Sequence, residues 1–194
     1  MIINLHGVGG SNPSLLTIFT KMEKTIRETR QIVIDQILNG LDLSNKDILE
    51  PSAGKGHLVE GILKAFPKVK SIDCVELNKE NREILFERLF NVVGNDFLKF
   101  ETNRRYDYVI AAPTYKNNVD VEHIMHMYKF LRVGGQIVSL TYPEWTIKNN
   151  ENQVLFRKWL EDKDYSMRML KDNSFVENHK TQPSVIITIK KTHE

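Results

Sequence analysis

The feature that most restricts the fold of this chain is the alternation, after residue 46, of short apolar runs with longer amphipathic segments. The runs have the length of β-strands, and several of the segments between them have the periodicity of helices. Strands that alternate with helices of about ten to fifteen residues form βαβ units and a largely parallel sheet. We predict strands at Asp47–Pro51, Ser71–Leu77, Asn91–Gly94, Tyr106–Ala112, Gln136–Tyr142, Tyr165–Lys171 and Ser184–Lys190. We predict helices at Gly56–Ala65, Lys79–Leu89, Asp120–Leu131 and Asn152–Asp162.

The last two predicted strands are joined differently from the others. Only the segment Asp172–Pro183, about a dozen residues, separates them, which is short for the crossover that a parallel pair requires. They are therefore predicted to form an antiparallel pair that closes the sheet. No internal repeat or low-complexity linker divides the chain, so one domain is the economical interpretation.

An amphipathic segment precedes this alternation. Its apolar residues recur at spacings of three, four and seven, which predicts a helix that ends near Asn39-Gly40. The residues are Leu15, Phe19, Met22, Ile26, Val33 and Ile37. We assign residues 1–45 to an N-terminal extension whose helix packs on the domain, and residues 46–194 to the domain itself.

The bulk composition excludes several classes of protein. Of the 194 residues, 41% are hydrophobic and 27% are charged, which is typical of a folded globular chain and not of a disordered one. The net charge of +2 does not indicate nucleic-acid binding, so such a partner would need a local basic patch. Cys74 is the only cysteine, which excludes an internal disulfide and fits a reducing compartment. Because no apolar run could span a bilayer and no leader is recognisable, we expect a cytoplasmic protein without a membrane partner.

A glycine-rich turn follows the first predicted core strand. Ile48–Glu50 ends this strand, and Ser52–Gly56 leads from it into a helix. Small residues there allow backbone amides to approach a ligand at the carboxyl edge of the sheet. Val59 stands where the dinucleotide pattern G-x-G-x-x-G has its third glycine, which disfavours a nicotinamide cofactor. The sequence also lacks the G-x-x-x-x-G-K-[ST] pattern, so Lys55 is not a P-loop lysine.

Two acidic residues follow the next two strands. Glu76 ends the second strand, where a carboxylate can accept hydrogen bonds from both hydroxyls of a ribose. Asp96-Phe97 follows the third strand and offers an acceptor beside an aromatic ring for an adenine. Taken singly, Glu76 is equally well read as a solvated strand end and Asp96 as a turn cap. Their order after the glycine turn makes a nucleoside site the better interpretation.

The run Glu50–Gly56, with Glu76 and Asp96 after it, resembles the cofactor motifs of class I S-adenosylmethionine-dependent methyltransferases. More narrowly, Asp47 to Lys191 is similar to small methylase-like proteins of bacteriophages and prophages, relatives of the N6-adenine DNA methyltransferases. The resemblance implies a Rossmann-like α/β fold, with a mostly parallel seven-stranded sheet, an antiparallel last strand and helices on both faces. It also implies S-adenosylmethionine as cofactor, with Glu50 at the methionine amino end, Glu76 at the ribose and Asp96 at the adenine. The implied cofactor-binding residues are Glu50, Pro51, Ser52, Ala53, Gly54, Gly56, Glu76, Leu77, Asp96, Phe97 and Ala111.

The resemblance places catalysis after the fourth strand, at Ala112-Pro113-Thr114-Tyr115. The amino-methylating relatives have N-P-P-Y or N-P-P-F there. The Asn oxygen and the carbonyl after it accept the hydrogens of the target amine, and the aromatic ring stacks on a base turned out of its helix. Ala112 accepts no hydrogen bond through its side chain, which could lower the rate on the order of a hundred- to a thousand-fold.

Three interpretations of this departure stay open. In the first, the chain is a methyltransferase for another substrate, with Tyr115 and Thr114 shaping the site. In the second, it is an impaired homologue that still binds the cofactor and serves as a binding or regulatory module. In the third, Ala112 is an engineered change. The resemblance favours an active methyltransferase. No insertion after the catalytic loop is large enough for a target-recognition region. A partner subunit, an RNA or protein substrate with its own shape, or a short exposed target therefore fits the sequence better than sequence-specific DNA modification by this chain alone. A nucleic-acid partner, DNA or RNA, and a protein partner both stay open.

Other signals are weaker. His123 and His126 lie on one face of a predicted helix, but zinc needs three or four ligands, so no metal is expected. Trp145 is interpreted as a base-stacking residue or, at least as well, as a packing residue. Basic residues on the N-terminal helix and at Lys190-Lys191 are where phosphate contacts would occur if nucleic acid is the substrate. Those on the helix are Lys21, Lys24, Arg27 and Arg30.

Overall fold

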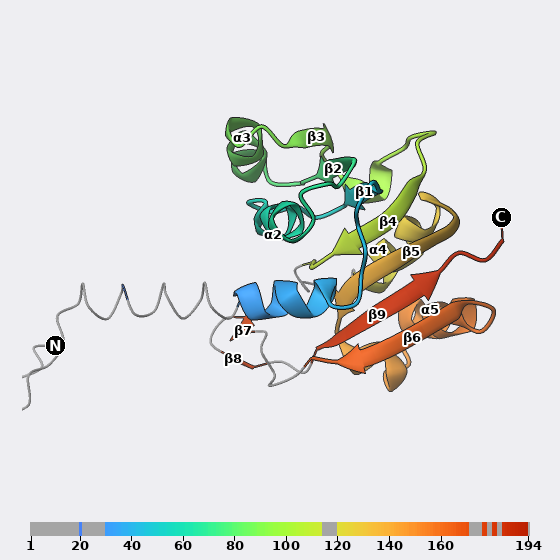
Figure 1. Cartoon of the computed structure of the whole chain (residues 1–194). Coiled ribbons are helices and arrows are strands. Elements are labelled where there is room, and N and C mark those ends of the chain that lie inside the picture. The colour runs from blue at the N-terminus through green and yellow to red at the C-terminus, as the bar shows by residue number, and fades with distance from the viewer. Residues whose placement is uncertain are drawn as a thin grey trace, which may run out of the picture.

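A seven-stranded sheet runs through the molecule, with its strands in the order β3-β2-β1-β4-β5-β9-β6 (Figure 1). The structure is a computed structural model that describes residues 20, 30–113, 120–170, 176–177, 180–181 and 184–193. The strands are β1 (Asp47–Glu50), β2 (Ser71–Val75), β3 (Asn91–Gly94), β4 (Tyr106–Ala111), β5 (Leu131–Thr141), β6 (Asp164–Met169) and β9 (Val185–Lys190).

Strand directions confirm the predicted class of fold. β1 pairs in parallel with β2 and β4, and the parallel pairing continues to β3 on one side and β5 on the other. β9 lies between β5 and β6 and is antiparallel to both. The predicted antiparallel pair of the last two strands is confirmed, and the last strand is an internal strand of the sheet.

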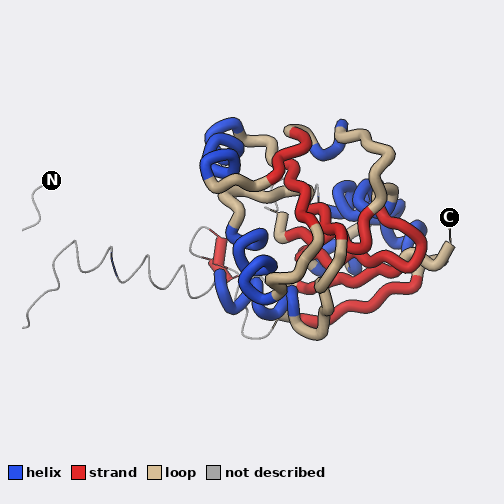
Figure 2. Tube along the Cα trace, turned by 45° about the horizontal axis from the view of Figure 1, so that its top comes forward, coloured by secondary structure: helices blue, strands red, loops and turns tan. Residues whose placement is uncertain are grey.

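Helices cover both faces of the sheet (Figures 1 and 2). The helix over residues 30–38 and α2 pack on one face, in a core cluster that includes Ile48, Ile110 and Ile186. α4 and α5 pack on the other face, with Leu49 and Ile187. Neighbouring residues such as Ile48 and Leu49 point to opposite faces because side chains alternate along a strand. The helices are α2 (His57–Ala65), α3 (Lys79–Glu87), α4 (Asp120–Tyr128) and α5 (Glu151–Leu160).

Local sequence explains where the helices begin and how they pack. The side chains of Asn78 and Asn150 accept hydrogen bonds from the first turns of α3 and α5, as helix caps do. In α2, Gly61 lets the N-terminal helix approach, since an added Cβ would lie 2.5 Å from Cγ2 of Ile34. Two short 3₁₀ helices, η1 (Phe97–Lys99) and η3 (Pro143–Thr146), follow β3 and β5. Within the described ranges, no helix has both the length and the apolar character that crossing a membrane would require.

Many element bounds differ from the prediction by one or two residues, and a few differences are larger. β5 begins at Leu131 and not at Gln136, and α4 ends at Tyr128, because Leu131 pairs with Tyr106 of β4. In the sequence, the pair Gly134-Gly135 indicates a turn before the strand. In the structure, Gly134 adopts a φ of 84°, which glycine tolerates, and the strand continues through the pair. A small antiparallel pair, β7 (Val176–Glu177) and β8 (Lys180–Thr181), was not predicted. Of the predicted N-terminal helix, residues 30–38 are helical, and Leu15, Phe19, Met22 and Ile26 lie outside the described residues.

A cluster of polar contacts lies at the amino ends of β1 and β2. Asp47, at the start of β1, accepts hydrogen bonds from Lys70 (2.9 Å), Ser71 (2.7 Å), Arg104 (2.9 Å) and Arg132 (3.1 Å). Burial opposes ionisation of this carboxyl, but the hydrogen bonds outweigh burial and hold its pKa well below the usual range. At the amino edge of the sheet, Asp47 therefore joins side chains from several segments, and both of its oxygens already accept two hydrogen bonds each.

Candidate active site

The predicted site residues gather at the opposite, carboxyl edge of the sheet. β1 ends at Glu50, β2 is followed by Glu76, and β4 ends at Ala111. The chain leaves β1 toward β2 on one side, whereas β4 lies on its other side. Such a switch in strand order opens a crevice at the carboxyl ends of the strands, which is where open α/β sheets bind ligands.

The glycine turn after β1 depends on two glycines for different reasons. Gly54 and Gly56 have φ of 54° and 83°, in the left-handed region. A Cβ at Gly56 would lie 2.5 Å from the Phe90 ring and 2.9 Å from Leu85, so this position is closed by packing. A Cβ at Gly54 would meet no atom of the described residues within 4 Å, so the space above the turn is open with respect to this part of the chain. The turn thus rests on the core on one side and presents a free surface on the other.

Glu76 fastens this turn to β2. Its Oε2 accepts a hydrogen bond from the Gly54 amide at 2.6 Å, and its Oε1 accepts from the Asn78 amide at 2.8 Å and the Asn81 side chain at 3.3 Å. The residue is only 8% exposed, so it is not the solvated strand end that the sequence left open. Each carboxylate oxygen has two lone pairs, so acceptor capacity is left on Oε2.

Glu50 is the most unusual charged group of this edge. It is 2% exposed, and its Oε2 has no hydrogen-bond partner among the described residues. Burial, together with the nearby Glu76, raises the pKa of Glu50 to about 8. Ser52, two residues on, also has a buried hydroxyl with no partner in this part of the chain. Buried polar atoms without partners are rare, and here they adjoin the open side of a glycine turn.

Asp96 serves as a cap. Its Oδ1 accepts from the Leu98 amide at 3.2 Å at the start of η1, and its Oδ2 pairs with Lys99 at 3.0 Å. The hydrogen bond from Lys99 lowers the pKa of Asp96. The Phe97 ring is 3% exposed and packs against His123 and His126, with ring centroids 5.3 and 4.9 Å apart. The cap interpretation is confirmed, and the Phe97 ring belongs to the core.

The remaining predicted residues are spread between surface and core. Leu77 is 72% exposed beside Glu76, whereas Pro51, Ala53 and Ala111 are buried. Ala112 is half-buried on the apolar cluster that includes Ile48 and Ile110, and Pro113 is buried. Thr114 and Tyr115, with the rest of the 114–119 segment, lie outside the described residues.

The sequence assigned no role to Asp120, which begins α4 directly after that segment. Its Oδ2 accepts from the Thr141 hydroxyl at 2.6 Å and from the Tyr142 amide at 3.4 Å, and it is 7% exposed. This contact joins α4 to the end of β5. Its signal in the sequence was an acidic residue at a predicted helix start, which does not reveal a partner about twenty residues away, because side-chain pairing between elements leaves no local pattern.

The sequence also singled out Trp145 and His123. Trp145 is 3% exposed and packs on Phe156 with ring centroids 5.0 Å apart, so the packing interpretation is confirmed. Arg157 donates to the Trp145 carbonyl at 2.6 Å and holds η3 in place. Burial lowers the pKa of His123, whose Nδ1 has no partner among the described residues. In the same part of the chain, no three His, Cys, Asp or Glu side chains gather as metal ligands would.

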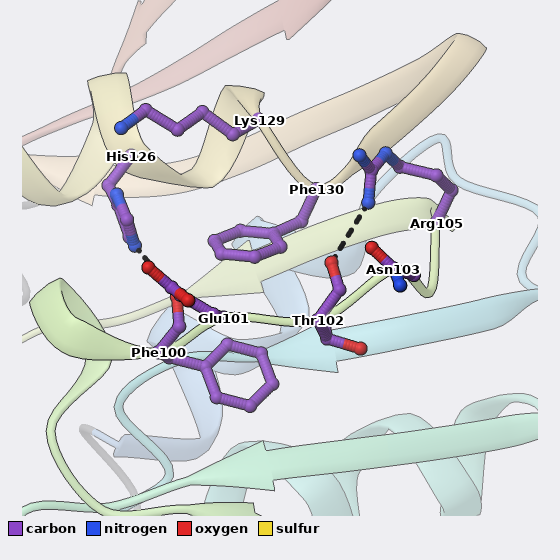
Figure 3. A pocket seen from close by; sticks show the side chains of 8 residues that line it. All are labelled: Phe100, Glu101, Thr102, Asn103, Arg105, His126, Lys129 and Phe130. Atoms are coloured by element: carbon purple, nitrogen blue, oxygen red, sulfur yellow. Dashed lines mark hydrogen bonds between the residues drawn. The ribbon is translucent and has the colours of Figure 1, made fainter.

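A cavity of about 490 Å³ lies elsewhere (Figure 3). It is lined by residues 100–103 and Arg105, which precede β4, and by the end of α4. His126 contacts the Phe100 carbonyl across it at 3.3 Å, and Arg105 donates to the Thr102 carbonyl at 3.1 Å. Because it adjoins the start of β4 and not its end, this cavity is separate from the carboxyl-edge site.

Comparison with solved structures identifies the architecture. The N-methyltransferase NodS of Bradyrhizobium japonicum WM9 superposes with a TM-score of 0.59 at 14% identity, over 88% of this chain and 98% of that one. The chain has the class I methyltransferase fold. A type I restriction-modification methyltransferase subunit of Streptococcus thermophilus shares this fold, with a TM-score of 0.65 at 15% identity over 84% of this chain and 43% of that one. NodS with bound S-adenosylhomocysteine gives a TM-score of 0.59 at 15% identity, over 87% of each chain.

Sequence comparison reaches less of this methyltransferase fold. Over 89 residues, the chain is 29% identical to ribosomal RNA small subunit methyltransferase A of Mesomycoplasma hyopneumoniae (strain 232). The aligned part is 43% of this chain and only 33% of that protein. No family model matches the sequence.

Proposed function

We propose that the chain is an S-adenosylmethionine-dependent methyltransferase that acts on an amino group of a nucleic-acid base, of the N6-adenine type. The observation that carries the cofactor part is Glu50, a buried carboxyl with an unpartnered oxygen beside an open glycine turn. A cation at this position would satisfy that oxygen and favour its ionised form. The α-ammonium of S-adenosylmethionine is such a cation. The class I fold and the product-bound NodS structure support this choice.

The other residues of the edge fit the same ligand. When bound, S-adenosylmethionine supplies a methyl group on a positively charged sulfur. Glu50 would hold the amino end, and the open face of Gly54 would leave room for the ligand beside the turn. Glu76 would use its remaining lone pairs for the ribose, while it keeps the Gly54 amide in place. Each carboxylate oxygen of Asp96 has one partner, Leu98 or Lys99. The remaining lone pairs would accept a hydrogen bond from the adenine.

Two relatives support an acceptor nitrogen on nucleic acid. NodS is an N-methyltransferase, and the Mesomycoplasma protein is a ribosomal RNA methyltransferase by name. The similarity of Ala112-Pro113-Thr114-Tyr115 to N-P-P-Y, and of Asp47 to Lys191 to phage adenine methylase-like proteins, points to adenine. Pro113 and Tyr115 would shape the acceptor site, with Thr114 between them. The carbonyl after Ala112 would accept one hydrogen of the amine, and the Ala112 side chain would accept none.

Ala112 also supports a second candidate function. A methyl group there removes one hydrogen-bond acceptor from the position at which the relatives hold the target amine. In this alternative the chain binds S-adenosylmethionine or a macromolecular partner as a regulatory module and turns over slowly or not at all.

Calorimetry with S-adenosylmethionine and S-adenosylhomocysteine tests the cofactor proposal. We expect Glu50→Gln to weaken binding of both at least about ten-fold, as loss of a charge-assisted hydrogen bond does. Glu83→Gln, which alters an exposed carboxylate of α3, is the matched control and should bind normally. Absence of binding to the parent chain at millimolar ligand would overturn both candidate functions in their cofactor-binding form.

A labelled-methyl assay over DNA and RNA then separates the two candidates. The first predicts incorporation into adenine by the parent chain. The second predicts none, and predicts that Ala112→Asn combined with Thr114→Pro creates it. Incorporation into another base or into protein would refute the adenine assignment and keep the methyltransferase.

A further inference from the structure

A second cavity, of about 840 Å³, lies between three elements that are distant in sequence. The helix over residues 30–38 forms one wall, α2 another, and the residues after α3 a third. His57, the first residue of α2, directly follows Gly56 of the cofactor turn, so this cleft begins where the candidate cofactor site ends. Its volume lies within the range of about 300–1,000 Å³ that is usual for ligand sites.

Positively charged side chains outnumber negatively charged ones among the described residues that line this cleft. Among the described residues that line it, Arg30, Lys64 and Arg88 are cations at neutral pH, and Glu60 is the only carboxylate. Glu60 is already paired with Arg88. Within the described part of the chain, no carboxylate pairs with Arg30 or Lys64. The cleft therefore has a local excess of two positive charges when His57 is neutral, on a chain whose whole net charge is only +2.

The contact between Arg30 and His57 places two basic side chains side by side in this cleft. Nη1 of Arg30 lies 2.9 Å from Nε2 of His57. A guanidinium has only donors, so the imidazole accepts and must be neutral at Nε2. Burial, and then the charge of Arg30, lower the pKa of His57 accordingly. Glu60 lies near enough to His57 to oppose this lowering, but it is paired with Arg88, so a bound anion would stabilise the remaining positive charge.

We propose that this cleft binds the phosphodiester backbone of the polynucleotide that carries the methyl acceptor. The inference rests on the proposed function and identifies where its substrate is held. Arg30 and Lys64 contact phosphate oxygens from opposite walls. Leu63 and Phe90 line the same cleft and give the sugars and bases an apolar surface. The cleft supplies the basic patch that the net charge of the chain does not, and it recognises backbone and not sequence.

The test is binding of fluorescently labelled single-stranded and duplex DNA and RNA to the full chain, by anisotropy over a series of salt concentrations. Arg30 and Lys64 are exposed, so Arg30→Gln/Lys64→Gln should fold as the parent does. We expect its affinity at about 0.1 M salt to fall on the order of ten- to a hundred-fold. The plot of log K against log salt should become less steep by about two, since each phosphate contact contributes about −0.9 to its slope on duplex DNA.

The matched control is Arg105→Gln/Lys129→Gln, which removes one arginine and one lysine from the cavity of Figure 3. It should bind polynucleotide as the parent does. An equal or larger loss in this control, or parental affinity in Arg30→Gln/Lys64→Gln, would overturn the inference. Inorganic phosphate and a mononucleotide distinguish a backbone site from a small-anion site. The proposal requires affinity to rise with oligonucleotide length, and saturation by a mononucleotide alone would overturn it.

Calorimetry with S-adenosylmethionine on the same proteins separates this inference from the proposed function. Normal cofactor binding without any polynucleotide binding would refute the proposed role of the cleft and would leave the proposed cofactor site standing. Polynucleotide binding without cofactor binding refutes the proposed function and leaves the cleft as a nucleic-acid surface.

Discussion

The two edges of the sheet carry buried carboxyl groups in opposite states. At the amino edge, Asp47 accepts hydrogen bonds from four side chains, and its pKa lies well below the usual range even though burial opposes this. At the carboxyl edge, Glu50 ends the same strand, is fully buried, and has an oxygen without a partner in the described chain, so burial raises its pKa to about 8. β1 thus begins with a carboxylate whose hydrogen bonding is complete and ends with a carboxyl that has an unpartnered oxygen.

This difference separates stability from function. A buried carboxylate with complete hydrogen bonding holds strands together and offers little to a ligand. A buried carboxyl without a partner destabilises the empty protein, and such groups gather at binding and catalytic sites. We therefore expect changes at Asp47 to act on folding, and changes at Glu50 to act on binding and on the pH dependence of folding.

The largest expected effect is the pH dependence that Glu50 imposes. Its folded pKa of about 8 lies above the unfolded value of 4.5, so the folded state binds the proton more tightly. The stability it contributes is complete below pH 4.5 and is lost as pH rises through 8, by an amount on the order of 4 kcal/mol. Urea denaturation of the cofactor-free chain between pH 5 and 9 measures this loss. Glu50→Gln should flatten the curve, and an unchanged curve would contradict the unpartnered state of Glu50.

Next in size is Asp47→Ala. This change leaves Arg104 and Arg132 without their shared carboxylate. Breaking a buried charge pair costs about 3 kcal/mol in the free energy of unfolding. The cost is smaller here because both arginine side chains are about 40% exposed. We expect a loss of about 2 kcal/mol in the free energy of unfolding at pH 7, where Asp47 is ionised in both states. Urea denaturation measures it, and cofactor affinity should not change. Asp42→Ala, which removes an exposed carboxylate before β1, is the control; an equal effect there would refute the assigned role of the Asp47 cluster.

The smallest expected effect concerns the turn that adjoins Glu50. Gly56→Ala places a Cβ 2.5 Å from the Phe90 ring at a left-handed φ, and should destabilise by about 2 kcal/mol. Gly54→Ala has a left-handed φ but open space, and should destabilise by about 1 kcal/mol. Chemical denaturation compares the two, and calorimetry should show the larger loss of cofactor affinity for Gly54→Ala. The reverse order in stability would contradict the closed and open sides of the turn.

Most of the secondary structure could be predicted because its cause is local. β3 was predicted with its observed bounds, and β1, β2 and β4 differ by two residues or fewer at one end, since apolar runs and their flanking turns mark buried strands. The start of β5 was missed, because Leu131 belongs to the strand only through its pairing with Tyr106. The short β7–β8 pair was missed because two-residue strands leave no periodicity to detect.

The sequence predicted where the candidate site residues stand along the chain, but not the side-chain contacts that join separate elements. The order of Glu50, Gly54 and Glu76 after successive strands placed them at one edge, and the structure joins Gly54 to Glu76 by a hydrogen bond. The contact of Asp120 with Thr141, and the cleft between Arg30 and His57, were not predicted, because each joins residues of separate elements.

By itself, the sequence determined the strands, the helices, the glycine turn and the residues that stand at the strand ends, since each depends on spacing along the chain. Only the tertiary structure decided which of these residues have partners. Asp47 is satisfied by arginines 57 and 85 positions away, whereas no partner reaches Oε2 of Glu50 within the described chain. The physical reason is that burial and hydrogen bonding depend on what neighbouring strands and helices bring into contact, and these two properties distinguish a structural carboxylate from a binding one.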